Sequence, residues 1–157
     1  TMAEVKIIVY QASHQKYFES LNRSWIEKFF WMEPIDVAVL QNPDTHILQK
    51  GGQIFMAECD GQVIGTVALK AVSENIFEFT KMAVDEKFQG IKAGEKLALA
   101  AIQYCQSKKA RAIILYSNTK LIPAITLYRK LGFAEVPLDG IYERSDIKME
   151  LTLEEDV

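Results

Sequence analysis

The chain has 157 residues, of which 49% are hydrophobic and 25% charged, and its formal net charge is −3. This size and composition favour one globular domain over residues 1–157 and exclude a disordered or fibrous protein. The one run of cations, at residues 108–111, falls where a helix is expected to end, so we expect no nucleic-acid partner.

Long apolar runs and a leader-like pattern are missing from the sequence, so we expect a cytoplasmic protein without a membrane contact. Cys59 and Cys105 lie far apart, and neither neighbours a histidine or a second cysteine. We therefore expect both cysteines to be reduced and buried, with no metal site.

The first quarter of the chain predicts a strand and a helix. Residues 5–10 are apolar and rich in β-branched side chains, which is typical of a strand. Phe18, Leu21, Trp25 and Phe29 recur every three or four residues, which predicts the apolar face of a helix. Core packing is accordingly the first interpretation of Trp25 and Phe29.

A second short helix is expected over residues 34–40, and Asn42-Pro43-Asp44 then breaks the chain. The remaining predicted elements are strands at 53–58, 63–69, 77–84, 112–116, 133–136 and 147–153, and helices at 93–106 and 119–131. Three consecutive strands followed by alternating helices and strands predict a mixed α/β fold.

The turn between the strand at 77–84 and the helix at 93–106 is the most informative segment. It carries Gly90 and Gly94, and the helix begins immediately after it. A strand, a glycine turn and a helix N-terminus together direct free backbone N–H groups at one point, which favours a phosphate ligand. The turn has neither the Gly-Lys-Ser/Thr of a P-loop nor the Gly-x-Gly-x-x-Gly of a dinucleotide site.

Residues 117–133, Ser-Asn-Thr-Lys-Leu-Ile-Pro-Ala-Ile-Thr-Leu-Tyr-Arg-Lys-Leu-Gly-Phe, resemble the Asn…Ala…Leu-Tyr-x-Lys-x-Gly-Phe signature of the GNAT superfamily of acyl-CoA-dependent N-acetyltransferases. Residues 89–94, Gln-Gly-Ile-Lys-Ala-Gly, are similar to the Q/R-x-x-G-x-G/A loop of that family. The resemblance implies a mixed sheet of about seven strands flanked by about four helices, with a splay between the fourth and fifth strands.

The resemblance also implies acetyl-CoA as cosubstrate, with no metal, and a set of residues that bind it. The loop would hold the pyrophosphate, the strand before it would pair with the pantetheine arm, and Asn118 would lie beside that arm. The implied set is Met82, Ala83, Val84, Gln89, Gly90, Ile91, Lys92, Ala93, Gly94, Glu95 and Asn118.

Lys92 departs from the family pattern, which has a glycine at that position. Its cation could bind the pyrophosphate, its side chain could weaken the cradle, or it could be a solvent-exposed lysine without a ligand.

Acetyl transfer to an amine needs a base for the amine, a donor for the oxyanion and an acid for the leaving thiolate. The resemblance places Tyr128 near the thioester sulfur as the acid and Glu78 on the cofactor strand as the base. Tyr128 could instead be a core tyrosine, and Glu78 a structural or substrate-binding carboxylate. Strict alternation places Glu78, Thr80 and Met82 on one face of the strand, unless a bulge intervenes.

Substrate recognition is expected from the aromatic and acidic residues Phe30, Trp31, Glu33 and Tyr142, since aromatics and carboxylates together suit a cationic amine. The leading interpretation is an N-acetyltransferase that acts on a primary amine of a small molecule or a protein, with a homodimer as a possible assembly. The alternative is a catalytically silent acyl-CoA sensor.

Overall fold

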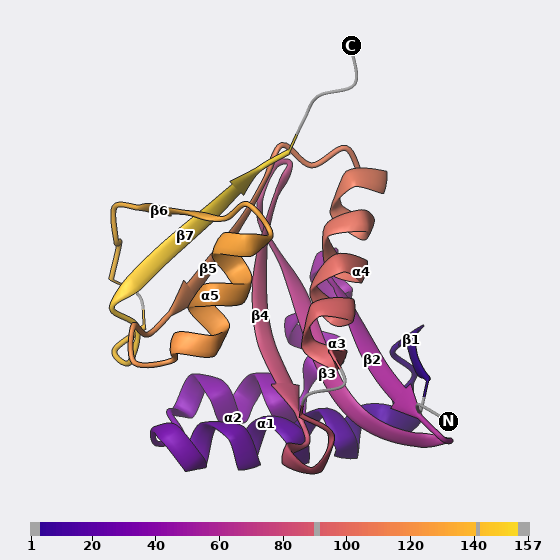
Figure 1. The fold of residues 1–157 in the computed structure, drawn as a ribbon. Coiled ribbons are helices and arrows are strands. Elements are labelled where there is room, and N and C mark those ends of the chain that lie inside the picture. Colours follow the sequence, from indigo (N-terminus) through magenta and orange to yellow (C-terminus); the bar gives the residue numbers. More distant parts are fainter. Residues whose placement is uncertain (1–3, 90–91, 141, 154–157) are drawn as a thin grey trace.

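The computed structural model describes residues 4–89, 92–140 and 142–153, which form a seven-stranded sheet with helices on both faces (Figure 1). The strands are β1 (Val5–Val9), β2 (Gln53–Cys59), β3 (Gln62–Ser73), β4 (Ile76–Val84), β5 (Ala112–Ser117), β6 (Ala134–Val136) and β7 (Ile147–Thr152). The helices are α1 (Gln15–Phe29), α2 (Pro34–Gln41), α3 (Pro43–His46), α4 (Ala93–Ser107) and α5 (Ile122–Lys130).

The predicted order of elements is confirmed, with one addition. The single turn α3 forms where the sequence predicted only a break, because Pro43 occupies the first helical turn, where its missing N–H is not needed. Proline acts in the same way at the start of α5, which begins at Ile122 rather than at residue 119.

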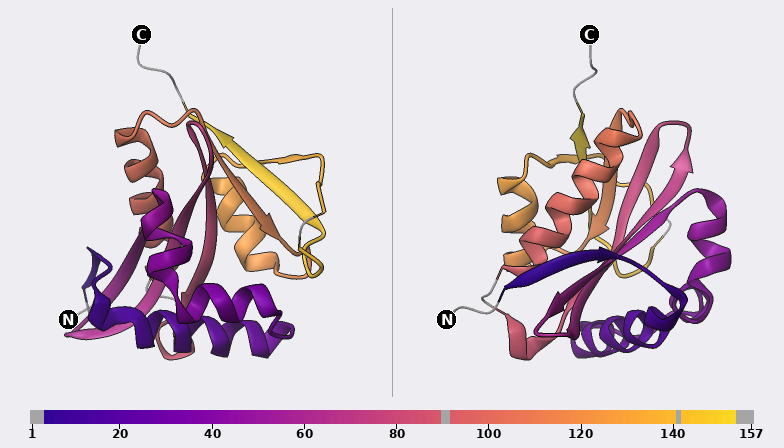
Figure 2. Two further views of the ribbon diagram at one scale, coloured as in Figure 1. Left: turned by 180° about the vertical axis from the view of Figure 1, so that it is seen from behind. Right: turned by 90° about the vertical axis from the view of Figure 1, so that its right-hand side faces the viewer.

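The sheet has the strand order β1-β2-β3-β4-β5-β7-β6, and all neighbouring strands are antiparallel except β4 and β5. The parallel pair requires a crossover connection, which α4 provides. Figure 2 shows α4 and α5 covering one face of the sheet and α1 and α2 covering the other. We call these the α4/α5 face and the α1/α2 face.

A splay separates β4 from β5 over the second half of β4. The two strands pair only at Ile76–Phe79 with Ala112–Leu115, and beyond this point β5 continues alongside β7. Residues 80–84 therefore have no partner on the β5 side within the described chain. Figure 1 shows the two strands diverging from their common end, as the family resemblance implied.

A bulge at Lys81 interrupts the alternation of β4. Thr80 lies opposite Ala68 and Ala83 lies opposite Thr66, so β4 has one more residue than β3 across this step. Lys81 has the positive φ of 55°, which L-residues rarely adopt outside special positions. The expectation that Met82 shares a face with Glu78 is wrong, because Met82 packs into the core of the α4/α5 face.

Two hydrophobic cores hold the layers together. The larger lies between the sheet and helices α4 and α5, and it includes Phe79, Leu97 and Tyr128. The smaller lies under α1 and α2 and is built around Phe18 and Leu40. Cys59 and Cys105, both free, are buried in the larger core.

Helix α1 buries a different stripe from the predicted one. Its buried residues are Phe18, Asn22 and Ile26, whereas Trp25 is half-buried and Phe29 is 38% exposed. The predicted spacing of three to four residues is correct, but the buried positions Asn22 and Ile26 each lie one residue after the predicted Leu21 and Trp25. The interpretation of Trp25 and Phe29 as core residues was therefore wrong, and a polar side chain lies in the middle of the buried stripe.

Candidate active site

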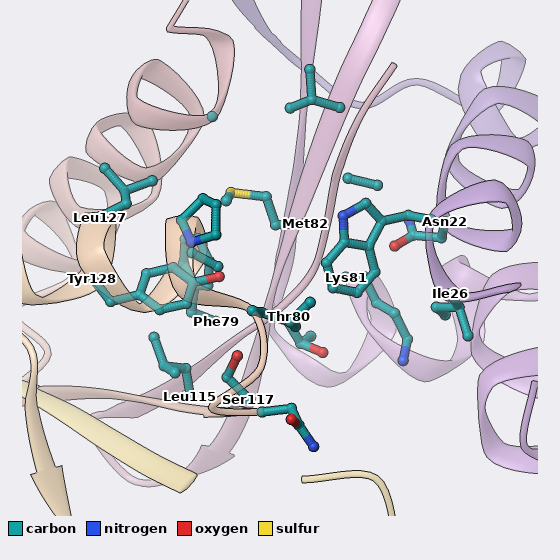
Figure 3. A pocket seen from close by; sticks show the side chains of 18 of the residues that line it. Asn22, Ile26, Phe79, Thr80, Lys81, Met82, Leu115, Ser117, Leu127 and Tyr128 are labelled. Carbon is teal, nitrogen blue, oxygen red and sulfur yellow. The ribbon is translucent and has the colours of Figure 1, made fainter. Parts of the chain in front are cut away.

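A cavity of about 300 Å³ passes through the splay and connects the two faces of the sheet. Helix α1, β4 from Glu78 onward, the start of α4, the end of β5 and helix α5 all contribute to its wall, together with Tyr142, Arg144 and Ser145. Figure 3 shows side chains from these elements pointing into one space, with α1 on one side and α5 on the other.

The cofactor-binding residues expected on β4 and at the start of α4 line this cavity. These are Met82, Ala83, Val84, Gln89, Lys92, Ala93 and Gly94. A Cβ placed on Gly94 would lie 3.7 Å from Met82 Cε, which is an ordinary contact. Packing within the protein therefore does not require glycine here.

Lys92 occupies the N-cap of α4 in the left-handed region, with φ 62° and ψ 24°, where glycine would be unstrained. Among the described residues no side chain caps this helix end, so the first-turn N–H groups have no acceptor from a described side chain. Gly90 and Ile91 lie outside the described residues. Glu95 does not line the cavity and instead forms an ion pair with Lys130 at 3.1 Å.

Asn118 lines the cavity at the end of β5, but its amide is also used within the protein. Its Nδ2 donates to the carbonyl of Arg144 at 2.9 Å, and its Oδ1 accepts from the N–H of Lys120 at 3.0 Å. Asn118 thus joins β5 to the connection between β6 and β7.

Tyr128 projects from α5 toward the middle of the cavity (Figure 3). Its ring packs edge-on against Phe79 and Phe133, with centroids 5.7 and 6.0 Å away. Burial raises the pKa of its hydroxyl, so the phenol is protonated at neutral pH. No described residue accepts a hydrogen bond from this hydroxyl, and Tyr128 lines the cavity while only 8% exposed, so the hydroxyl is available to a ligand there.

Glu78 enters the cavity from the opposite face of β4 and is only 2% exposed. It accepts a hydrogen bond from the Tyr142 hydroxyl at 2.9 Å. Burial raises the pKa of Glu78, and this effect outweighs the opposing hydrogen bond from Tyr142 and the charges of nearby lysines. A carboxyl with a raised pKa is better matched to proton transfer near neutral pH.

A buried ionic cluster that the sequence does not predict lies beside Glu78. Arg144 contacts both oxygens of Asp36 and also Glu33 at 2.7 Å, and Lys81 Nζ lies 2.7 Å from Asp36. Burial acts to raise the pKa of Asp36, but hydrogen bonds from Arg144 and the charge of Lys81 prevail and hold it at about 2. The four residues come from three separated segments, so no local spacing indicates them.

The residues expected to recognise a substrate divide into two groups. Phe30 and Tyr142 line the cavity, whereas Trp31 is 56% exposed and lies outside its wall. Glu33 lies outside the wall as well, behind its partner Arg144.

In the described part of the chain, no helix combines the length and apolarity needed to cross a membrane. The same residues contain no cluster of His, Cys, Asp and Glu side chains that could hold a metal ion.

Comparison with solved structures extends over nearly the whole chain. An acetyltransferase of the GNAT family from Staphylococcus aureus Mu50 superposes with a TM-score of 0.87 at 24% identity, covering 96% of this chain and 100% of that one. The PaiA N-acetyltransferase of Thermoplasma acidophilum, solved in complex with coenzyme A, has a TM-score of 0.75 at 20% identity, covering 96% and 99%. At these identities the likeness establishes the fold.

Sequence comparison covers less of the relatives. A mycothiol acetyltransferase from Thermomonospora curvata is 32% identical over 90 residues, which are 57% of this chain and 30% of that protein. The chain spans less than a third of the length of the curated relatives it matches. A model of the acetyltransferase (GNAT) family matches residues 9–133, and the chain therefore belongs to this family.

Proposed function

We propose that the protein is an N-acetyltransferase that moves an acetyl group from acetyl-CoA to a primary amine. One observation carries the proposal: Glu78 and Tyr128 project from opposite faces of the sheet into a single cavity that passes through the splay. A base and an acid on two sides of one reaction space suit the attack of an amine on a thioester.

The residues on the α4/α5 face fit acetyl-CoA. Residues 80–84 leave the β5 edge of β4 unpaired, and an extended ligand with amide groups can hydrogen-bond to such an edge. The uncapped N-terminus of α4 supplies N–H groups for the pyrophosphate. Packing within the protein does not require glycine at position 94. A glycine there would instead allow the phosphate to approach the backbone closely, which supports a phosphate site.

In the proposed reaction, acetyl-CoA supplies the acetyl group as a thioester. Glu78 accepts a proton from the bound ammonium, directly or through one water, and the amine then forms the new C–N bond. A backbone N–H of β4 near Met82 stabilises the oxyanion, and Tyr128 donates its proton to the sulfur as the C–S bond breaks. The nitrogen then loses its remaining extra proton, which gives a neutral amide and returns Tyr128 to the neutral phenol. Tyr142 orients Glu78 through their hydrogen bond.

Binding and turnover test the proposal separately. Acetyl-CoA should raise the melting temperature, and release of free thiol should depend on an added amine from a panel of small amines and peptides. Binding without turnover for any amine would favour a silent acyl-CoA sensor instead. An unchanged melting temperature with acetyl-CoA would exclude both functions.

A further inference from the structure

Asn22 is the polar residue in the middle of the buried stripe of α1. It is 1% exposed and lies one helical turn from Phe18 and one turn from Ile26. Its Nδ2 donates to the carbonyl of Phe18 at 2.9 Å, and this bond fixes the orientation of the amide. The side-chain oxygen, Oδ1, then faces away from the helix.

The Oδ1 atom of Asn22 has no hydrogen-bond partner among the described residues. Every fully buried side-chain oxygen or nitrogen of these residues does have a partner, so Oδ1 is not fully buried. The oxygen must therefore open onto the cavity, whose wall includes Asn22. Figure 3 shows the amide at the side of the cavity opposite Tyr128. Because Oδ1 opens onto the cavity, it can accept a hydrogen bond from water or from a ligand bound there.

The neighbouring groups determine which kind of ligand fits. The cations Lys81 and Arg144 line the same cavity, but each is paired with Asp36, and Arg144 also with Glu33. Trp25 and Phe30 supply aromatic surface from α1 and from the residue after it. The polar groups that can accept a hydrogen bond from a ligand on this side therefore include Asn22 Oδ1 and Glu78.

From this arrangement we infer that Asn22 binds the acceptor amine, with Oδ1 accepting a hydrogen bond from the ammonium group before Glu78 removes its proton. The inference rests on the proposed function and narrows its substrate class. The acceptor is a protonated primary amine attached to an apolar or aromatic group, which contacts Trp25 and Phe30. Asn22 contributes binding rather than proton transfer.

The test uses the best amine of the panel and two variants of Asn22. Asn22→Leu removes the acceptor oxygen, so the KM for the amine should rise at least about tenfold, since hydrogen bonds to charged groups are the stronger ones. The kcat value and the Kd for acetyl-CoA should stay within about threefold of wild type, because only uniform binding is lost. Asn22→Gln keeps an amide that can donate to the Phe18 carbonyl and accept from the ammonium, so it should recover part of the amine affinity.

Gln15→Leu is the matched control, because Gln15 is an amide on the same helix that also donates to a backbone carbonyl but does not line the cavity. It should leave the amine KM unchanged. An unchanged KM in Asn22→Leu, a failure of Asn22→Gln to recover any affinity, or an acetyl-CoA Kd that weakens in parallel would each overturn the inference.

Direct titration of the amine into the protein saturated with coenzyme A separates this inference from the proposed function. Amine binding that is lost in Asn22→Leu, without acetyl transfer in the wild type, would support Asn22 as a binding residue and reject the enzyme. If no amine binds to the wild type, the inference is wrong.

Discussion

The two walls of the cavity are lined by chemically different groups. On the α4/α5 face the wall consists of β4 backbone, the start of α4 and apolar side chains such as Met82 and Val84. On the α1/α2 face the wall includes aromatic side chains of α1 and, in addition, the carboxyl of Glu78, the amide of Asn22 and the cations Lys81 and Arg144, which are held by Asp36 behind the wall.

Under the proposed function, the chemical difference between the two walls corresponds to two kinds of ligand. A backbone edge and a helix N-terminus bind any molecule that carries amides and phosphates, so the α4/α5 face suits one common cosubstrate. Buried side-chain charges and amides are selective because a ligand that leaves them unpaired is penalised. Substitutions on the α1/α2 face should therefore change the kinetic constants for the amine and leave the Kd for acetyl-CoA unchanged.

Glu78→Gln should have the largest effect. Loss of the base should lower kcat/KM for the amine by about 10²–10⁴-fold, with the Kd for acetyl-CoA unchanged. The wild-type pH profile should have an acidic limb with a midpoint above the ordinary glutamate value of 4.5, and the variant should lack it. A variant that keeps this limb would place the base elsewhere.

The same substitution should not destabilise the fold. A carboxyl whose folded pKa is raised contributes stability at low pH, and this contribution is lost as the pH rises through the folded pKa. Glutamine does not ionise and can still accept from Tyr142. The variant should melt at or above the wild-type temperature at pH 7, and a lower value would point to a structural role for Glu78.

Asp36→Ala should cost about 3–5 kcal/mol in the free energy of unfolding, measured with urea, because it leaves Lys81 and Arg144 buried without their shared partner. The amine KM should rise as the segment around Arg144 loosens, while acetyl-CoA binding stays constant. Glu33→Gln, which removes only the second partner of Arg144, should cost less. Equal costs for the two would contradict a cluster centred on Asp36.

The cluster also predicts an acid limit of stability. The folded pKa of Asp36 is about 2 and its ordinary value is 3.8, so its contribution is complete above about pH 4 and is lost as the pH falls toward 2. Asp36→Asn should flatten the dependence of the unfolding free energy on pH in this range. An identical slope in wild type and variant would assign the acid sensitivity to other carboxyls.

Tyr128→Phe should lower kcat at least about tenfold and leave the Kd for acetyl-CoA unchanged, since only the proton donor is removed. The hydroxyl bonds to no described side chain, so the melting temperature should change little. An unchanged kcat would return Tyr128 to the role of a core residue and would leave the α4/α5 face as a binding surface without an acid.

Lys92→Gly should have the smallest effect. Glycine relieves the left-handed backbone and should stabilise the fold by up to about 1 kcal/mol. If the cation contacts the pyrophosphate, the Kd for coenzyme A should rise about threefold, as expected of one partly exposed charge pair. A lower Kd would instead mean that the lysine weakens the cradle.

The α4/α5 wall could be predicted from the sequence because its signals are local. The β4 strand, the glycine turn and the start of α4 follow one another within residues 76–95, and each has a recognisable pattern. Tyr128 and Asn118 belong to a second continuous segment. Local chemistry of this kind depends little on how distant parts of the chain pack.

The α1/α2 wall could not be predicted in the same way. Asp36, Lys81 and Arg144 meet only after the sheet has brought three distant segments together. The burial of Asn22 depends on the rotation of α1 about its axis, and apolar spacing fixes that rotation only to within a residue or so. Trp25 therefore fits the predicted apolar stripe equally well in the sequence but lines the cavity in the structure.

The extra residue in β4 has a consequence for how such proteins can diversify. Upstream of Lys81, the odd-numbered side chain of Phe79 packs against Tyr128, whereas downstream it is the even-numbered Met82 and Val84 that lie on that side. The side-chain alternation of β4 thus changes phase at the bulge, so the residues before it and after it present opposite parities to the same face. Under the proposed function, substitutions before the bulge can change the preference for the acceptor amine while the residues after the bulge keep their geometry for acetyl-CoA, so specificity can change without loss of cofactor binding.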